Sequence, residues 1–333
     1  MTAVQPEKKS GAHVPQGKQD YYSTLRTLSE ASVHQHFDAF LDIKWDDPEF
    51  AVIPDDDRWI LTDADEIGAH PWYKSLPRER QIEIGRYRYA LIAKVGLQFE
   101  QLLISGVMNR LLWEDNNNPE FRYATHEVTE ETHHTQMFQE LVNRVCPDVA
   151  GANKVFKLLV PFFASAGAWF PEAFFVGVLA GEEPIDHLQK AIMRSGSAVH
   201  PLPSRVMQIH IAEEARHIGF AHQYLEQHVP ELDPVRKAVL SVVFPIVMRG
   251  LCDVIMVPSK QARRDMGIPD EVAKGIWWGA AESKKTLRDM FTDVRMLADE
   301  LGLRNPVAKL LWKAFKIDGK PARFRGQPAS ATH

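Results

Sequence analysis

The sequence has few of the features that mark specialised classes of protein. Its 333 residues include only two cysteines, Cys146 and Cys252, so we expect buried free thiols rather than a disulfide framework. The formal net charge of −5 provides no basic excess for nucleic acid. The polar stretch 1–20 lacks the apolar core of a signal peptide, and no run of about 18 apolar residues predicts a membrane span. We therefore expect a cytoplasmic protein that binds neither nucleic acid nor a membrane.

The composition that remains is that of a globular enzyme, with 45% apolar and 25% charged residues. Apolar residues recur with helical periodicity and strand-like alternation is lacking, which predicts an all-α fold. Breaks at proline and Asn-rich turns predict helices over 78–114, 119–146, 152–169, 171–193, 203–228, 234–257, 270–301 and 305–313. A short helix is expected within 21–40 and irregular structure over 41–76. The predicted domain is 21–317, between a disordered tail (1–20) and a mobile tail (318–333).

The most informative motif is the pattern His-x-x-x-Glu-x-x-His formed by His210, Glu214 and His217. The stretch from Ser204 to Gly219 has no break, so a helix is expected, and this spacing stacks the three side chains on one helical face. Two imidazoles and a carboxylate are costly to bury unless they bind something, and a metal ion is the usual ligand. Taken alone, the motif could also be a solvated face with two chance histidines.

A second motif favours the metal. Glu131 and His134 form a Glu-x-x-His pair one turn apart on another predicted helix. In four-helix bundles with carboxylate-bridged di-metal sites, two helices each give a Glu-x-x-His pair and the other two each give one Glu. Glu131/His134 and Glu214/His217 fit the two pairs, and His210 is a third imidazole beyond that set.

The two single carboxylates follow from helical phase. Glu100 is the only acid on an apolar face of the predicted helix 78–114, although it could also lie at the edge of that face. Between the adjacent acids Glu182 and Glu183, the face of Glu182 is mostly apolar and that of Glu183 mostly polar. Periodicity therefore selects Glu182. Pro184 weakens this assignment, because proline can kink a helix and change which residues share a face.

The predicted site thus has four carboxylates and three imidazoles on four helices, in a ferritin-like four-helix bundle with additional helices. Oxygen and nitrogen ligands without thiolate suit two iron ions, or manganese, better than structural zinc. The full predicted set is Glu100, Glu131, His134, Glu182, His210, Glu214 and His217.

Several neighbours of these residues receive a different interpretation. His133, Glu130 and Glu213 each lie about 100° around the helix from a predicted ligand, so we expect them off the metal-binding face. Glu127 shares the face of Glu131 and could lie beside the site or on the bundle surface. The aromatic residues of 169–175 are expected in the core or, alternatively, in a pocket wall near the metals.

The sequence also resembles the p-aminobenzoate N-oxygenase (AurF-type) family. The stretches that carry the resemblance, over roughly 45–310, are Phe99-Glu-Gln-Leu-Leu103, Glu131-Thr-His-His-Thr-Gln-Met137, Ala180-Gly-Glu-Glu-Pro-Ile185 and His210-Ile-Ala-Glu-Glu-Ala-Arg-His217. The family's ligands fall on the seven predicted positions, except that an ungapped count back from His210 selects Glu183 in place of Glu182. His210 is the histidine that distinguishes this family from ordinary ferritin-like sites.

What the resemblance implies is a di-iron oxygenase that activates O2 and oxidises the nitrogen of a small aromatic amine in secondary metabolism. It also implies an external electron donor, either a ferredoxin or a reductase, because the sequence has no flavin or nicotinamide motif, and it is compatible with a homodimer. Two alternatives stay open. One is a di-iron hydroxylase or desaturase that acts at carbon, and the other is a ferritin-like iron-binding protein.

Overall fold

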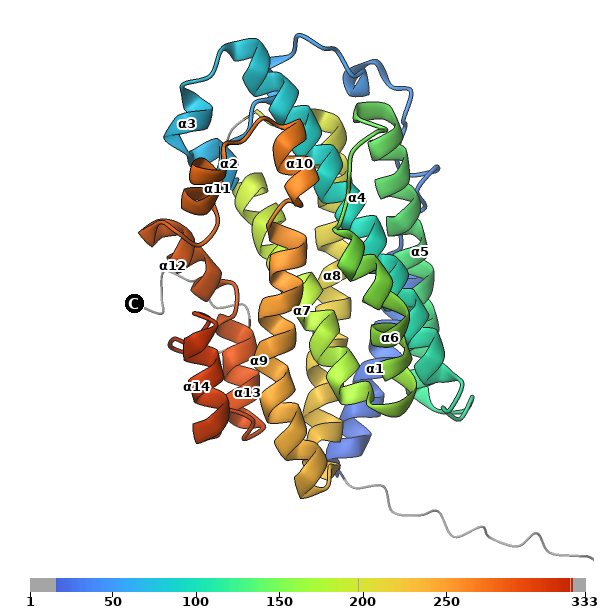
Figure 1. Cartoon of the computed structure of the whole chain (residues 1–333). Helices are drawn as coiled ribbons and strands as arrows, with labels where there is room; N and C mark the ends of the chain where they lie inside the picture. The colour runs from blue at the N-terminus through green and yellow to red at the C-terminus, as the bar shows by residue number, and fades with distance from the viewer. Residues whose placement is uncertain (1–15, 197, 324, 326–333) are drawn as a thin grey trace, which may run out of the picture.

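The computed structural model describes residues 16–196, 198–323 and 325, and every regular element within them is a helix (Figure 1). The predicted all-α class is therefore confirmed. The α-helices are α1 (Gln16–His34), α2 (Glu66–Ala69), α3 (Pro71–Lys74), α4 (Arg78–Leu111), α5 (Pro119–Val145), α6 (Lys154–Trp169), α7 (Pro171–Arg194), α8 (Pro201–His228), α9 (Pro234–Met256), α10 (Lys260–Asp265), α11 (Asp270–Ile276), α12 (Ala281–Asp289), α13 (Thr292–Glu300) and α14 (Pro306–Ala314).

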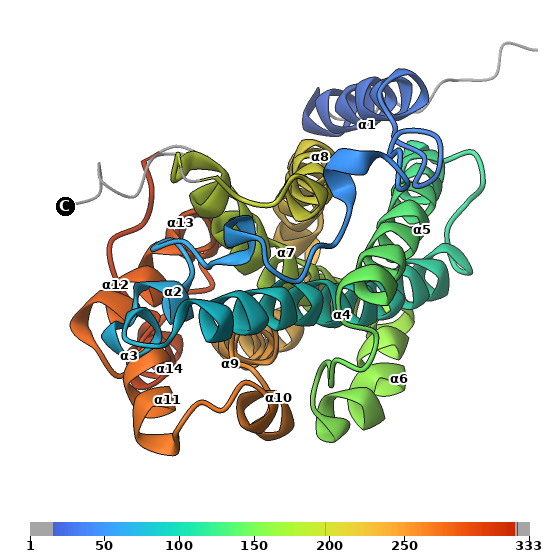
Figure 2. The same cartoon turned by 90° about the horizontal axis from the view of Figure 1, so that it is seen from above.

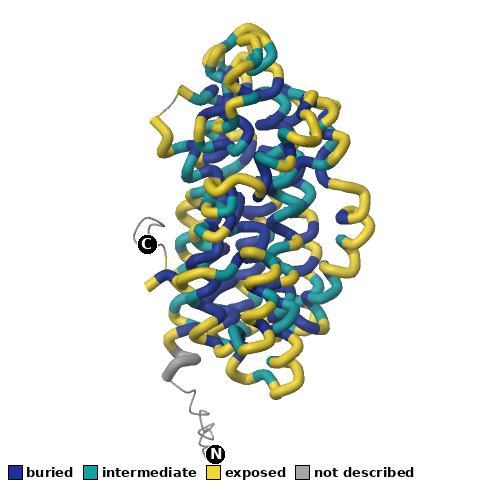
Figure 3. Tube along the Cα trace, turned by 60° about the vertical axis from the view of Figure 1, so that its left-hand side comes forward, coloured by how far each residue is buried: buried dark blue, intermediate teal, exposed yellow. Residues whose placement is uncertain are grey.

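Four long helices form the central bundle. Helix α4 packs along α5, α7 packs along α8, and α5 also contacts α8 (Figures 1 and 2). Helix α1 covers α5 and α8 from one side, while α6 packs on α4 and α7, and α9 packs on α7. Buried residues run through the middle of this bundle and exposed residues face outward (Figure 3). The bundle therefore encloses a dry interior between α4, α5, α7 and α8.

Local sequence sets where the bundle helices begin. Asn118 and His200 stand just before α5 and α8, and each side chain accepts a hydrogen bond from a backbone N–H of the first turn. Proline follows each of them at the first helical position, where its missing N–H costs nothing. The loops between α4 and α5 and between α7 and α8 therefore end in defined caps, which fix the phase of both ligand-bearing helices.

The structure corrects the predicted helix over 270–301, which consists of the three short helices α11, α12 and α13. Trp278 has a φ of +63°, and a Cβ on Gly279 would lie 2.0 Å from the Lys274 carbonyl oxygen. A left-handed residue followed by an obligatory glycine ends α11 here, and apolar periodicity does not report this kind of turn.

The predicted chain ends are also corrected. Helix α1 begins at Gln16 and ends at His34, so it overlaps the predicted tail 1–20, of which 1–15 lies outside the described residues. At the other end, the Ala322 N–H donates to the Thr292 carbonyl over 3.0 Å, and Arg295 Nε donates to the Lys320 carbonyl over 3.1 Å. The segment 318–323 thus contacts α13, while 324 and 326–333 lie outside the described residues, and the mobility of the tail stays a prediction.

Two helical stretches, Arg78–Leu111 and Pro234–Asp265, are long and apolar enough to cross a membrane by length and composition alone. This differs from the sequence-based expectation that no such run exists. About half of each apolar window is buried inside the bundle, at 56% and 50%. Helix α4 also carries buried Glu100 in its middle, and apolar core helices of bundles pass the same test. The absence of a membrane partner stays a prediction.

Candidate metal centre

The four central helices bring all seven predicted ligands together. Each of these side chains is at most 2% exposed. Their oxygen and nitrogen atoms form four overlapping groups, and within each group the atoms lie within 4.8 Å of one another. One residue comes from α4, two from α5, one from α7 and three from α8. The geometry is that expected of the predicted site, and the role of these residues as metal ligands stays a prediction.

The two Glu-x-x-His pairs face each other across the interior. Glu131 places one oxygen 2.9 Å from His134 Nδ1 and the other 2.9 Å from His217 Nδ1. Glu214 Oε1 lies 3.2 Å from His134 Nδ1 and 3.3 Å from His217 Nδ1. Each carboxylate therefore reaches both imidazoles, so Glu131 and Glu214 could each contribute to holding both ions of a metal pair.

His210 adds its imidazole to the same cluster. Its Nε2 lies 3.6 Å from Glu100 Oε1 and 3.5 Å from Glu214 Oε1, and its ring centroid is 4.8 Å from that of His134. Burial lowers the pKa of His210 to about 4, so the ring is neutral at physiological pH. A neutral imidazole with Nε2 aimed at carboxylates is suited to bind a metal ion.

The structure separates the two adjacent acids of α7. Glu182 is fully buried, both of its oxygens lack a hydrogen-bond partner, and it groups with Glu100, Glu131, His210 and Glu214. Glu183 turns away, with Oε1 3.0 Å from His222 Nε2. Helix α7 continues through Pro184, so the phase argument from the apolar face agrees with the observed placement.

We expect Glu182→Ala to abolish metal-dependent activity and to lower metal content, because it removes an oxygen donor that nothing else in the cluster replaces. Glu183→Ala is the matched control, and it should leave both unchanged within about twofold because only the contact to His222 is lost. Metal analysis and activity assays on both variants check this. The reverse order of effects would assign Glu183 as the ligand.

Two functional acids were missed by the sequence analysis. Glu130 and Glu213 lie off the metal-binding face, as predicted, but both are buried beside it, which the sequence did not indicate. Glu130 Oε2 lies 2.7 Å from His217 Nε2, and Glu213 Oε2 lies 2.8 Å from His134 Nε2. Each acid thus holds the far nitrogen of the histidine on the opposite helix, which turns Nδ1 toward the cluster. The repeat of Glu-Glu-x-x-His at 130–134 and 213–217 was the available signal.

Arg216 ties these two outer acids together. Its guanidinium lies 3.0 Å from Glu130 Oε1 and 3.6 Å from Glu213 Oε1, and it donates to the Gln35 carbonyl over 3.0 Å. The Phe37 N–H donates to Glu213 Oε1 over 3.0 Å. The segment that follows α1 therefore closes this side of the site and supplies the positive charge that two buried carboxylates need.

Removing one outer acid should weaken the site without destroying it. Glu213→Gln replaces a carboxylate that polarises His134, and outer partners of metal-binding histidines typically contribute about 10- to 100-fold in metal affinity or activity. We expect a loss in that range, measured by competition with a chelator of known affinity. Glu226→Gln on the exposed face of the same helix is the control, and equal affinities for the two variants would contradict this role.

Glu127 and His133 are two further neighbours of the predicted ligands, and they lie in different surroundings. Glu127 is completely buried one turn before Glu131, and both of its oxygens lack a partner among the described residues. Burial raises the pKa of Glu127 well above its ordinary value, because the ionised carboxylate has lost its contact with water. His133 instead lies outside the cluster, with Nδ1 3.9 Å from Asp38 Oδ2, in agreement with its predicted rotation away from the site.

The electrostatics of the cluster fit a pair of divalent cations. Burial, followed by neighbouring carboxylates, raises the pKa of both Glu100 and Glu182 well above the ordinary value. Among the described residues, both oxygens of Glu182 and one oxygen each of Glu100 and Glu214 have no hydrogen-bond partner. Buried carboxylate oxygens without donors need a cation. Four ionised ligand carboxylates carry the charge that two divalent ions balance, and the all-oxygen-and-nitrogen donor set suits iron or manganese.

Metal-dependent stability should therefore increase with pH. Without metal, the folded protein holds protons on Glu100, Glu127 and Glu182 that the unfolded chain has released above about pH 5, so the free energy of unfolding falls as pH rises. Metal binding displaces the protons from Glu100 and Glu182. As pH rises above the ordinary glutamate pKa of about 4.3, the thermal midpoint of the metal-free protein should fall. The increase in thermal midpoint on adding metal should become larger as pH rises. An increase that does not depend on pH would contradict this prediction.

Comparisons with known proteins agree with this geometry. The family model described as "P-aminobenzoate N-oxygenase AurF" matches residues 18–302. An uncharacterized protein of Mycobacterium bovis and one of Mycobacterium tuberculosis are each 52% identical over 309 residues, which covers 93% of this chain and 91% of the relative. A second uncharacterized protein of Mycobacterium tuberculosis is 51% identical over the same shares. The family match covers all seven residues of the cluster.

Proposed function

The chain belongs to the p-aminobenzoate N-oxygenase family, and from this premise we propose that it oxidises the nitrogen of a small aromatic amine with O2. The product lies along the series from hydroxylamine through nitroso to nitro compound. The family is one of di-iron oxygenases, and the buried cluster of carboxylates and imidazoles supplies ligands for two iron ions. The observation that carries the proposal is His210, a third imidazole inside a site that otherwise has the composition of a ferritin-like centre.

Each part of the site has a defined role in this proposal. Bound iron supplies the electrons and the open coordination positions that O2 activation needs. Glu131 and Glu214 hold the two metal positions together, since each contacts both His134 and His217. The outer acids and Arg216 fix the two imidazole rings, and the apolar bundle around them excludes water. Glu127 is buried one turn before Glu131, and its raised pKa favours the neutral form of this carboxyl.

The same site could hold manganese, and the reaction has requirements beyond the chain. Returning iron to the ferrous state consumes electrons, so we propose a separate ferredoxin or reductase as the donor. Aromatic substrate and O2 are the other partners that the family implies. We propose a cytoplasmic, homodimeric enzyme of secondary metabolism.

Two other functions use the same cluster. A di-iron hydroxylase or desaturase would act at carbon, and a ferritin-like protein would oxidise and store iron. His210 disfavours iron storage, because a neutral third imidazole occupies a position next to Glu100 and Glu214 that storage chemistry does not require. The chain is also longer than a minimal four-helix bundle.

A panel of arylamines given to the iron-loaded, chemically reduced protein under O2 tests the proposal. We expect at least one amine to yield an N-oxygenated product that liquid chromatography with mass spectrometry detects. Hydroxylation at ring carbon would favour carbon chemistry. Ferric iron that accumulates beyond about two ions per chain, with no organic product, would favour iron storage.

A further inference from the structure

An apolar groove opens between α4, α6, α7 and α9. It has a volume of about 640 Å³, no charged side chain lines it, and Asn153 provides its only amide. Several of its apolar side chains remain exposed, including Phe162 at 67%, Trp169 at 65% and Ile246 at 45%. Apolar surface gathered in this way marks a binding site rather than an ordinary protein exterior.

The inner end of the groove reaches the level of the metal centre. Phe99 and Val178 line the groove, and they stand one residue before Glu100 and one turn before Glu182. The Phe99 ring packs directly on Gly181, where an added Cβ would lie 1.8 Å from a ring atom. Phe99 therefore forms the wall between the groove and this side of the cluster.

Two glycines keep the groove open. A Cβ added to Gly250 on α9 would meet nothing within 4 Å. A Cβ added to Gly177 on α7 would meet only Leu251 and Val247, at 3.7 and 3.8 Å, which is ordinary contact. No steric clash excludes a larger side chain at either position, so the small residues leave free volume that an apolar chain can fill.

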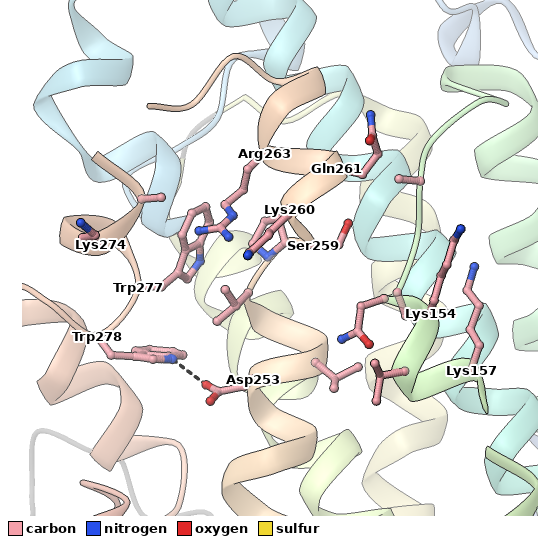
Figure 4. Close-up of a pocket in the computed structure, with 18 residues that line it drawn as sticks. Lys154, Lys157, Asp253, Ser259, Lys260, Gln261, Arg263, Lys274, Trp277 and Trp278 are labelled. Carbon is pink, nitrogen blue, oxygen red and sulfur yellow. Dashed lines mark hydrogen bonds between the residues drawn. The ribbon is translucent and has the colours of Figure 1, made fainter. Parts of the chain in front are cut away.

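A second cavity of about 950 Å³, whose lining residues are drawn in Figure 4, adjoins the outer end of the groove. The two cavities share the lining residues Asn153, Val155 and Val254, so they are direct neighbours. Basic side chains from the start of α6 and from α10 and α11 surround this mouth. They are Lys154, Lys157, Lys260, Arg263 and Lys274.

The charge of the mouth is not balanced by acids. Its one lining carboxylate, Asp253, accepts a hydrogen bond from Trp278 Nε1 over 2.8 Å and pairs with Arg249 over 3.0 Å. Lys274 pairs with Glu271, and the other four cations have no acidic partner within 4.0 Å among the described residues. The mouth is therefore positive and suited to an anion.

Buried donors at the mouth point to the same kind of ligand. The Nε of Arg263 and the Nε1 of Trp277 are both buried, and neither has a hydrogen-bond acceptor among the described residues. Both residues line the cavity. Buried N–H groups without acceptors are costly, and the oxygens of an anionic group entering the mouth would accept from them.

We propose that the groove and its basic mouth form one binding site for a long-chain fatty carboxylate. The alkyl chain lies in the groove with its end at Phe99, and the carboxylate lies among Lys154, Lys260 and Arg263. The apolar lining without charge selects the chain, and the unpaired cations with the buried donors select the anionic head. This site does not depend on the proposed amine oxidation, because occupancy requires no turnover.

Calorimetric titration of palmitate into the iron-loaded protein, without reductant and below the aggregation concentration of the lipid, tests the groove. We expect saturable one-to-one binding that Gly250→Phe weakens at least about tenfold, because the new ring fills the free volume. Ala238→Phe, on an exposed position of the same helix outside the groove, is the matched control and should bind as the unmodified protein does. If Gly250→Phe fails to fold by circular dichroism, Ile246→Trp tests the same point.

The double variant Lys154→Glu/Lys260→Glu tests the mouth. It should weaken the binding of palmitate about tenfold and leave the binding of hexadecanol, which has no charge, unchanged. Lys309→Glu/Lys313→Glu on α14 changes the net charge equally at a distant surface and should have no effect.

Three results would overturn the proposal. The first is the absence of saturable palmitate binding, and the second is binding that Gly250→Phe does not alter. The third is that Gly250→Phe converts a dimer to a monomer in sedimentation, or abolishes sedimentation with phosphatidylglycerol vesicles, while palmitate does neither. That outcome would assign the groove to a second copy of the chain or to a membrane surface.

Discussion

Replacing Glu131 with Ala should remove most of the iron from the protein. Both oxygens of Glu131 lie 2.9 Å from an imidazole nitrogen, one on His134 and one on His217, so this residue contacts both sides of the cluster. Loss of a bridging carboxylate removes a donor from each of two metal positions at once. We expect elemental analysis to fall from about two iron ions per chain to a small fraction of one.

The same variant should lose the stabilisation that metal gives. A ligand present at about 1,000 times its dissociation constant adds about 4 kcal/mol to the free energy of unfolding. The thermal midpoint gained on adding iron should therefore shrink by several degrees in Glu131→Ala. Glu140→Ala, which removes a partly exposed acid from the same helix that pairs with Arg144, is the control. A Glu131→Ala protein that binds iron as well as this control would contradict the bridging position.

His210→Ala should separate metal binding from oxidation. The variant keeps the two Glu-x-x-His pairs, Glu100 and Glu182, so we expect it to retain more than half of its iron and its helical circular dichroism. Turnover of an aromatic amine should fall about 10- to 100-fold, because the neutral donor next to Glu100 and Glu214 is gone.

His133→Ala is the matched control for this prediction. His133 adjoins a predicted ligand in sequence, yet its side chain contacts the segment after α1 instead of the cluster. It should retain both iron and activity. If His210→Ala oxidises the amine as fast as His133→Ala, then His210 has no role in the reaction, and the argument against a ferritin-like function fails.

Helical phase selected Glu100 and Glu182, and the spacing of the two histidine motifs selected the other five predicted ligands; the structure brings all seven side chains together. Glu131, Glu182 and Glu214 share a helical face with large apolar neighbours, and burial on four helices then brings those faces together. The adjacent acids Glu182 and Glu183 illustrate this use of helical phase. Their side chains are about 100° apart around α7, and Glu182 points into the buried cluster while Glu183 contacts His222.

The same rotation of about 100° explains why the sequence did not indicate the contacts that Glu130 and Glu213 make with the two histidines. Glu130 and Glu213 lie one residue from a ligand, and a single amphipathic face assigns such positions to the outside. In the fold, α1 and the residues after it cover that outer side. Arg216 of α8 pairs with both acids, and the Phe37 N–H donates to Glu213. The position of α1, which ends at residue 34 while α5 begins at residue 119, is not encoded in the local period of α5.

Backbone conformation accounts for the remaining errors. The helix predicted over 270–301 ends early because Trp278 is left-handed and Gly279 approaches the Lys274 carbonyl too closely for a side chain. The C-terminal segment is rich in glycine and proline but is held by hydrogen bonds from Arg295, which depend on tertiary packing.

The most direct test of the central claim is a single turnover under 18O2. Iron-loaded, chemically reduced protein is mixed with an aromatic amine that the panel identified, and the product is analysed by mass spectrometry. We expect 18O on the nitrogen of the product, in an amount that follows the iron content and disappears in Glu131→Ala. Label found only on carbon, or ferric iron formed at the same rate and yield with and without amine and with no labelled product, would contradict it.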